Sequence, residues 1–154
     1  MEEHMKKTLI VFLMLSCLGP VGAYATTNRS HAAIGEPGVQ ENVTRTIRLE
    51  AYEYRFSPSE INIKQDETIR FIVKNTGKKK HEMMIDTMQH LREHEKMMRQ
   101  HDHGAYTEPN QIILEPGEEK ELIWHFTQAG TIDFACPVPG HFKGMRGKII
   151  VESK

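Results

Sequence analysis

The sequence predicts an all-β protein, an antiparallel Greek-key sandwich of two sheets with one helical insert near residues 86–103. Three observations predict this fold class. Short stretches in which apolar and polar residues alternate recur along the chain, as expected of half-buried strands. Gly, Pro, Asn and Asp residues punctuate these stretches at regular intervals. The length of 154 residues suits a single domain, and short strands between turns are typical of a sandwich.

The sequence pattern of the first half of the domain predicts four short strands. Residues 47–51 alternate strictly between apolar and charged side chains, which indicates a half-buried strand. The strand at 68–74 likewise places Ile69, Phe71 and Val73 on one face. The four predicted strands cover residues 47–51, 54–56, 61–63 and 68–74. The turns that bound them are Ser57-Pro58, Gln65-Asp66 and Asn75-Thr76-Gly77.

The segment Asp86 to His103 interrupts this rhythm. It has no turn residues and is dense in Met, Glu, Lys, Arg, Gln and His, so it predicts a helix. At about 100° per residue, Met88, Leu91 and Met98 fall on one side, where we expect them to pack on the sandwich.

The strand pattern resumes after the insert and continues to the end of the chain. Turns are marked by Pro116-Gly117 and Ala129-Gly130. The predicted strands in this part cover residues 111–114, 121–126, 131–136 and 147–151.

Residues 1–25 have the pattern of an export signal. Lys6 and Lys7 precede an apolar run, Thr8 to Leu18, that is too short to span a bilayer comfortably, and Ala23-Tyr24-Ala25 fits a cleavage site. We therefore expect a periplasmic protein with a mature chain from Thr26 and no membrane association after cleavage. An acylated Cys17 is the alternative, but the residues before it fit poorly. Residues 26–42 predict a flexible segment, and 43–154 the folded domain.

The charge balance and the cysteine content restrict the classes of function that fit this chain. Lys and Arg total 20 against 21 Asp and Glu, so nothing points to a nucleic acid or an anionic membrane as a partner. The predicted mature chain has a single cysteine, Cys136, and cannot form an internal disulfide. A lone thiol in an oxidising compartment needs an explanation, and metal ligation is one.

Residues 136–145 carry the strongest chemical signal. This loop places a thiolate, an imidazole and a thioether, from Cys136, His141 and Met145, between two strands. Two histidines and one cysteine with a weak axial methionine are typical of a mononuclear electron-transfer copper site, and His81 after a turn is the candidate second histidine. We thus expect one copper ion, Cu(I) or Cu(II), per chain. Zinc is the competing metal. A thiol-nucleophile enzyme using Cys136 and His141 lacks an orienting third group.

Four stretches of the sequence match a known family: Tyr54-Arg55-Phe56-Ser57-Pro58, Lys80-His81-Glu82-Met83, Trp124 through Thr131 and Cys136 through Met145. They resemble the cupredoxins, the family of azurin, plastocyanin and pseudoazurin, and the chain is most similar to periplasmic cupredoxins linked to copper tolerance. Its Cys-x4-His-x3-Met spacing is similar to that of azurin. Two features differ: Glu82 stands where azurin and plastocyanin usually have Asn, and copper-tolerance relatives often have one more residue between His and Met.

The resemblance implies a type 1 copper site with ligands His81, Cys136, His141 and Met145, and a role in copper tolerance and homeostasis without catalysis. The alternative is a dedicated electron carrier between periplasmic redox enzymes, with the partner docking near His141. A cupredoxin-like enzyme is a third hypothesis. A two-copper centre is excluded because the loop has no second cysteine.

The predicted helix suggests a second copper site. Four side chains fall within about 60° on a helical wheel, and imidazoles and thioethers favour Cu(I). They are His90, His94, Met97 and His101. The alternative is a solvated face, because Glu93, Glu95 and Lys96 lie among them. Both interpretations stay open at this point.

Overall fold

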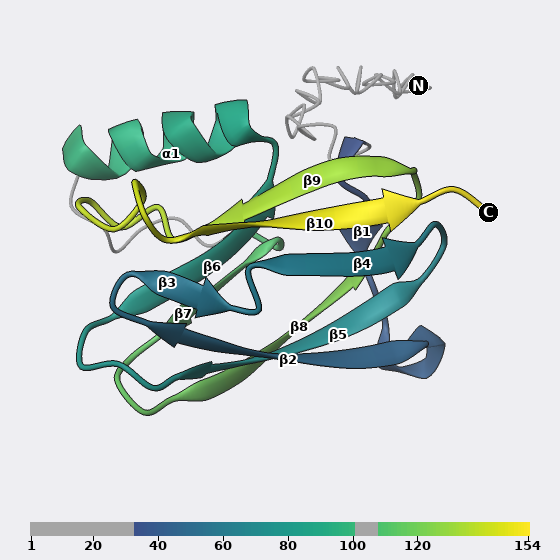
Figure 1. The fold of residues 1–154 in the computed structure, drawn as a ribbon, viewed down its shortest axis with the longest axis horizontal. Coiled ribbons are helices and arrows are strands. Elements are labelled where there is room, and N and C mark those ends of the chain that lie inside the picture. The colour runs from purple at the N-terminus through teal and green to yellow at the C-terminus, as the bar shows by residue number, and fades with distance from the viewer. Residues whose placement is uncertain (1–32, 101–107) are drawn as a thin grey trace, which may run out of the picture.

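In the computed structural model, which describes residues 33–100 and 108–154, two five-stranded sheets pack face to face and a single helix covers the outer face of one sheet (Figure 1). The predicted all-β sandwich with a helical insert is therefore confirmed. The first sheet has the order β1 (Glu36–Pro37), β8 (Glu119–His125), β5 (Thr68–Asn75), β2 (Arg45–Tyr52) and β3 (Arg55–Ser57). The second has the order β4 (Glu60–Lys64), β10 (Arg146–Glu152), β9 (Gly130–Ala135), β6 (His81–Asp86) and β7 (Gln111–Leu114).

The sheets are mixed rather than purely antiparallel, which corrects the expectation from the sequence. β2 runs parallel to β5, and β4 runs parallel to β10. Between β2 and β5 the chain leaves the first sheet after β3, enters the second sheet with β4, and then returns to the first sheet as β5. Alternation of side chains identifies a strand but not the direction of its neighbour, so this feature needed the structure.

Alternating side chains of the two sheets fill one core between the layers. Phe71 and Phe126 meet edge-on, as do Phe56 and Phe134. Trp124 is fully buried, and its indole nitrogen donates a hydrogen bond to the carbonyl oxygen of Ile34 at 2.6 Å. These contacts give the rigid framework on which the loops at one end of the sandwich rest.

The described part of the predicted flexible segment, residues 33–42, is packed on the sandwich. β1 pairs with β8 in antiparallel register, Ile34 is buried, and residues 40–42 form a short 3-10 helix. The described part of the predicted segment 26–42 therefore includes one strand and one short helical turn. A two-residue strand is too short to leave an alternating pattern in the sequence.

Helix α1 (Met88–Gln100) lies over β6 and β9, within the predicted insert. Thr87 caps its first turn, since its hydroxyl accepts a hydrogen bond from the backbone N–H of His90 at 3.3 Å. Leu91 is fully buried as predicted, but Met88 and Met98 are only half-buried, and His94 is buried instead. Across residues 33–100 and 108–154, no helix has the length and apolar character needed to span a membrane.

Candidate metal centre

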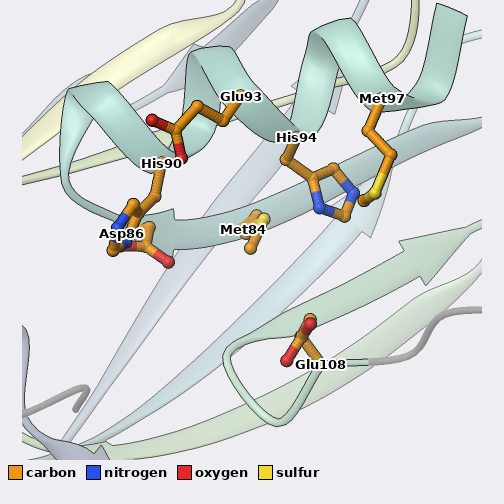
Figure 2. Close-up of a pocket in the computed structure, with 7 residues that line it drawn as sticks. All are labelled: Met84, Asp86, His90, Glu93, His94, Met97 and Glu108. Carbon is orange, nitrogen blue, oxygen red and sulfur yellow. The ribbon is translucent and has the colours of Figure 1, made fainter. Parts of the chain in front are cut away.

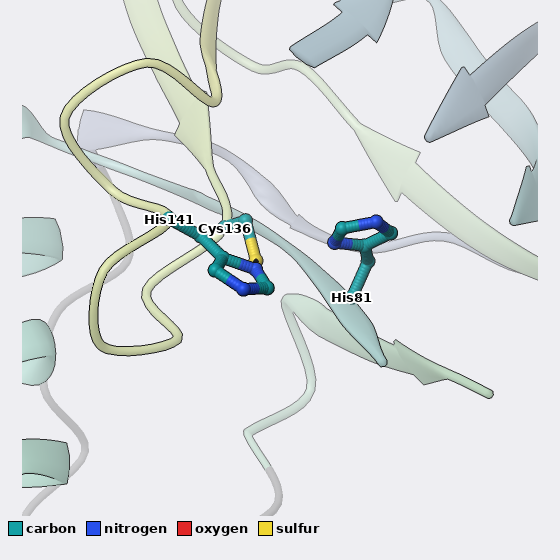
Figure 3. A group of neighbouring side chains, drawn as sticks. All are labelled: His81, Cys136 and His141. Carbon is teal, nitrogen blue, oxygen red and sulfur yellow. Dashed lines mark hydrogen bonds between the residues drawn. The ribbon is translucent and has the colours of Figure 1, made fainter. Parts of the chain in front are cut away.

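Three predicted ligands meet at one end of the sandwich. His81 is the first residue of β6, Cys136 directly follows β9, and His141 lies in the loop between β9 and β10. Their potential ligand atoms all lie within 4.8 Å of one another, and all three side chains are buried (Figure 3). The Cys136 sulfur is 3.6 Å from Nδ1 of His141, and the two imidazole rings have centroids 5.1 Å apart.

Strand pairing explains why distant residues converge here. β6 and β9 are antiparallel neighbours in which Met84 pairs with Ala135, so Cys136 emerges beside the start of β6. The backbone N–H of Glu82 donates a hydrogen bond to the Cys136 sulfur at 3.3 Å. The register of two strands thus places the sulfur next to His81.

The loop that carries the other ligands is closed by its own backbone. The N–H of Cys136 donates to the carbonyl oxygen of Met145, and the N–H of Met145 donates to that of His141, each at 3.0 Å. Gly140 has φ of +88°, a conformation that disfavours other residues. Met145, the predicted axial ligand, is fully buried in the same core cluster as Cys136. The loop is therefore a compact unit.

The donor set fits a metal ion, and His81 gives the clearest sign. Both ring nitrogens of His81 are buried and have no hydrogen-bond partner among the described residues. Glu53 Oε1, the carboxylate oxygen facing Nε2, is 3.9 Å away, too far for a hydrogen bond. Because an unsatisfied buried polar atom costs about 1–3 kcal/mol, such an imidazole calls for a further binding partner.

Burial also sets the protonation of the three groups. Desolvation lowers the pKa of His81 and of His141, and in His141 the neighbouring His81 and Lys79 lower it further, so both rings are neutral near pH 7. Burial raises the pKa of the Cys136 thiol to about 12, although backbone N–H groups of Glu82 and Val138 oppose this. The thiol is therefore protonated until a cation displaces its proton.

Two residues that sequence analysis did not assign to the site, Glu53 and Asn75, hold the loop before His81. The Glu53 carboxylate accepts hydrogen bonds from the backbone N–H groups of Lys78 and Lys79. The buried Asn75 side chain donates to the carbonyl oxygens of Lys79 and Leu114. Asn75 also accepts the N–H of Gly77, a turn that the Asn75-Thr76-Gly77 motif signals. The sequence does not reveal that Asn75 bonds to Leu114 or that Glu53 bonds to this loop.

The side of the centre nearest to solvent is bordered by an aromatic residue. The ring of Tyr54 meets the His141 ring edge-on, with centroids 4.7 Å apart, and Tyr54 is 40 % exposed. Lys79 Nζ donates to the Tyr54 hydroxyl at 3.0 Å. His141 itself is 7 % exposed, so it lies closer to the surface than His81 at 0 %. His141 is thus the most exposed of the three candidate ligands.

The structure also brings together part of the second predicted set. His90, His94 and Met97 line one pocket between α1 and β6. Nδ1 of His90 is 3.0 Å from Oδ1 of Asp86, and Nε2 of His94 is 3.8 Å from Oε1 of Glu82. His101 lies outside the described residues. Met84, which also lines the pocket, comes from β6 and was not one of the four residues in the predicted set.

Comparison with known proteins agrees with this geometry. The chain is 34 % identical over 135 residues to a protein of Rubrivivax gelatinosus named copper-resistant cuproprotein CopI, covering 86 % of this chain and 82 % of the relative. It is 32 % identical over 162 residues to the Pseudomonas aeruginosa protein of the same name, covering 85 % and 90 %. Among solved structures, auracyanin B superposes with a TM-score of 0.62 at 19 % identity, covering 77 % of this chain and 96 % of auracyanin B.

The family model for the cupredoxin-like domain matches residues 21–151. This match covers most of the chain, and both curated relatives are matched over more than two thirds of their length. Together with the sandwich fold and the convergent His-Cys-His donors, these matches place the chain in a family: it belongs to the cupredoxins.

Proposed function

We propose that this chain is a periplasmic type 1 copper protein that takes part in copper tolerance and homeostasis. The proposed ligands of one copper ion are His81, Cys136, His141 and Met145. We further propose that residues 1–25 are a cleaved export signal and that the mature chain, from Thr26, carries the cupredoxin domain in residues 43–154. The two relatives named copper-resistant cuproproteins support the tolerance role.

One observation carries the proposal: a buried thiol and two buried imidazoles converge, and one imidazole has no hydrogen-bond partner among the described residues. Soft sulfur and borderline nitrogen donors in this combination suit copper. When bound, copper supplies a one-electron couple between Cu(I) and Cu(II). Zinc would accept the same donors, and a redox-active, coloured site is the property that separates the two metals.

The residues of the chain have distinct tasks in this proposal. Cys136 gives up its proton on binding and supplies the strongest bond, while the hydrogen bond from Glu82 N–H orients and stabilises its thiolate. His81 and His141 would hold the ion through neutral nitrogens, and Met145 would add a weak thioether donor. The closed loop and the packed sandwich exclude water and keep the donors in place, so a change of oxidation state requires little rearrangement.

A spectroscopic titration tests the copper site. The purified mature protein is titrated with Cu(II) and followed by absorption and electron paramagnetic resonance. We expect one equivalent to produce an intense visible band that the Cys136→Ser variant lacks. A band of the same intensity in Cys136→Ser would refute the assignment of Cys136, and binding without colour in the wild type would favour a zinc-type site.

A growth assay tests the biological role. A host that lacks the gene is complemented with the wild-type chain or with Cys136→Ser, and growth is measured against added copper. We expect only the wild type to restore tolerance. Equal tolerance with both chains would favour the alternative, a dedicated electron carrier whose partner docks near His141.

A further inference from the structure

A second group of soft donors lies between helix α1 and strand β6, on the opposite side of β6 from the core of the sandwich. Side chains of β6 alternate: Met83 and Ile85 belong to the main core, whereas Met84 packs with Leu91 of the helix. The pocket that remains beside this contact is lined by Met84, Asp86, His90, Glu93, His94, Met97 and Glu108 (Figure 2).

The helix directs two donors into this pocket. His94 and Met97 are three residues apart and so share one face of α1. Figure 2 shows the His94 ring and the Met97 side chain both directed toward β6, where Met84 lies. His94 is 9 % exposed although an imidazole is polar, and the helix is otherwise strongly charged on its exposed side. A polar ring held inward at this position suits a ligand.

We propose that Met84, His94 and Met97 form a second copper site, specific for Cu(I), which rests on the proposed role of the chain in copper handling. Two thioethers and one imidazole are neutral, soft donors, and such sets favour Cu(I) over Cu(II) and over hard cations. The carboxyl groups of Asp86, Glu93 and Glu108 in the pocket wall add negative charge that attracts a cation. This set replaces the one predicted from the helix alone.

His90 has a different place in this proposal. Its Nδ1 is 3.0 Å from Oδ1 of Asp86, four residues earlier, so the ring is held at the wall of the pocket. Asp86 is itself bonded to the side chain of Asn110 at 3.2 Å. His90 therefore orients the edge of the site, whereas His94, deeper under the helix, is the ligand.

One residue, Glu82, lies next to both proposed copper sites. The carboxyl Oε1 of Glu82 lies 3.8 Å from Nε2 of His94, and the backbone N–H of Glu82 donates to the Cys136 sulfur at 3.3 Å. The proposed Cu(I) site therefore lies directly behind the type 1 centre, on the other face of the same strand. This position is suited to holding a copper ion beside the centre.

Silver(I), a soft ion that does not change oxidation state, is the probe for the first test. The mature protein is labelled with 13C at the methionine methyl groups and titrated with Ag(I). In the Cys136→Ser background, which removes the first site, we expect the methyl signals of Met84 and Met97 to shift and those of Met88 and Met98 to stay. Shifts confined to Met88 and Met98, or no shift at all, would overturn the proposal.

Competition with a chromophoric Cu(I) chelator gives the second test. We expect Met84→Leu combined with Met97→Leu to lose one equivalent of Cu(I) and to keep the Cu(II) band of Cys136, which shows that the fold is intact. The matched control, Met88→Leu with Met98→Leu, should lose neither. His94→Gln should reproduce the loss without altering any methionine.

The outcomes of these two tests distinguish a failure of the proposed Cu(I) site from a failure of the proposed type 1 copper site. Retention of the second equivalent in Met84→Leu/Met97→Leu and in His94→Gln refutes the Cu(I) site and leaves the type 1 site untouched. Absence of the Cu(II) band in a wild-type chain that still shows the Met84 and Met97 shifts refutes the type 1 site instead. Loss of all Cu(I) binding in Cys136→Ser also refutes the second site.

Discussion

The loop that presents His81 depends on one buried amide, and Asn75→Ala tests this dependence. The Asn75 side chain is fully buried and makes three hydrogen bonds, to Lys79 O at 2.7 Å, to Leu114 O at 3.1 Å and from Gly77 N–H at 2.9 Å. Leu114 pairs directly with His81 across β6 and β7. The Asn75 amide thus connects the segment just before β6, which begins with His81, to the end of β7.

The size of the effect follows from these contacts. Each bond contributes about 0.5–1.5 kcal/mol net, and backbone groups left buried without partners add to the loss, so we expect Asn75→Ala to lower the free energy of unfolding by about 2–4 kcal/mol. For a domain of this size 1 kcal/mol corresponds to roughly 4 °C in Tm, and the expected decrease is therefore about 8–16 °C.

Urea unfolding of the metal-free mature protein, followed by the fluorescence of the single tryptophan, measures this quantity. Asn62→Ala is the matched control, because Asn62 is an exposed residue of β4 whose backbone bonds survive the change. Copper affinity should decrease in Asn75→Ala and not in Asn62→Ala. A stability loss below about 1 kcal/mol with unchanged copper affinity would refute the view that this amide holds the His81 loop.

Four further substitutions test the ligand loop and the strand that follows it, with Gly117→Ala, in the loop between β7 and β8, as a control. Met145→Leu should keep copper bound and raise the reduction potential measured by voltammetry, and complete loss of copper would contradict a weak axial role. Gly140 and Gly117 have φ of +88° and +82°, and an added Cβ would meet no atom within 4 Å at either position. Gly140→Ala and Gly117→Ala should therefore each lower the free energy of unfolding by about 1 kcal/mol through backbone strain alone, but only Gly140→Ala should alter the copper spectrum. Gly147→Ala should destabilise by roughly 3 kcal/mol in thermal unfolding, since the added carbon would lie 2.1 Å from a ring carbon of Phe134; a near-neutral result would contradict this packing.

Alternation in the sequence predicted strands only where one face of the strand is less buried than the other. β4, with an exposed–buried alternation from Glu60 to Lys64, was predicted correctly. β6 was not among the predicted strands, because all six of its residues are buried and exposed residues do not alternate with buried ones along it. The helix itself was predicted, but Thr87 rather than Asp86 precedes its first turn.

Three of the four predicted ligands have a local signal in the sequence, and His81 was added as a histidine after a turn that matches the family pattern. Cys136, His141 and Met145 lie within ten residues, and donor chemistry alone distinguishes them. Glu53 and Asn75 were not assigned to the site, because their role depends on which strands become neighbours. Met84 was omitted from the second predicted set for the same reason, since its proximity to the helix arises from tertiary packing.

Anomalous diffraction at the copper edge, from crystals of the copper-loaded mature protein, tests the central claim most directly. The account predicts a copper peak bonded to the Cys136 sulfur and to one ring nitrogen each of His81 and His141, with the Met145 sulfur on the axial side. A copper-loaded structure in which His81 stays unliganded, or in which copper lies only under helix α1, would contradict it.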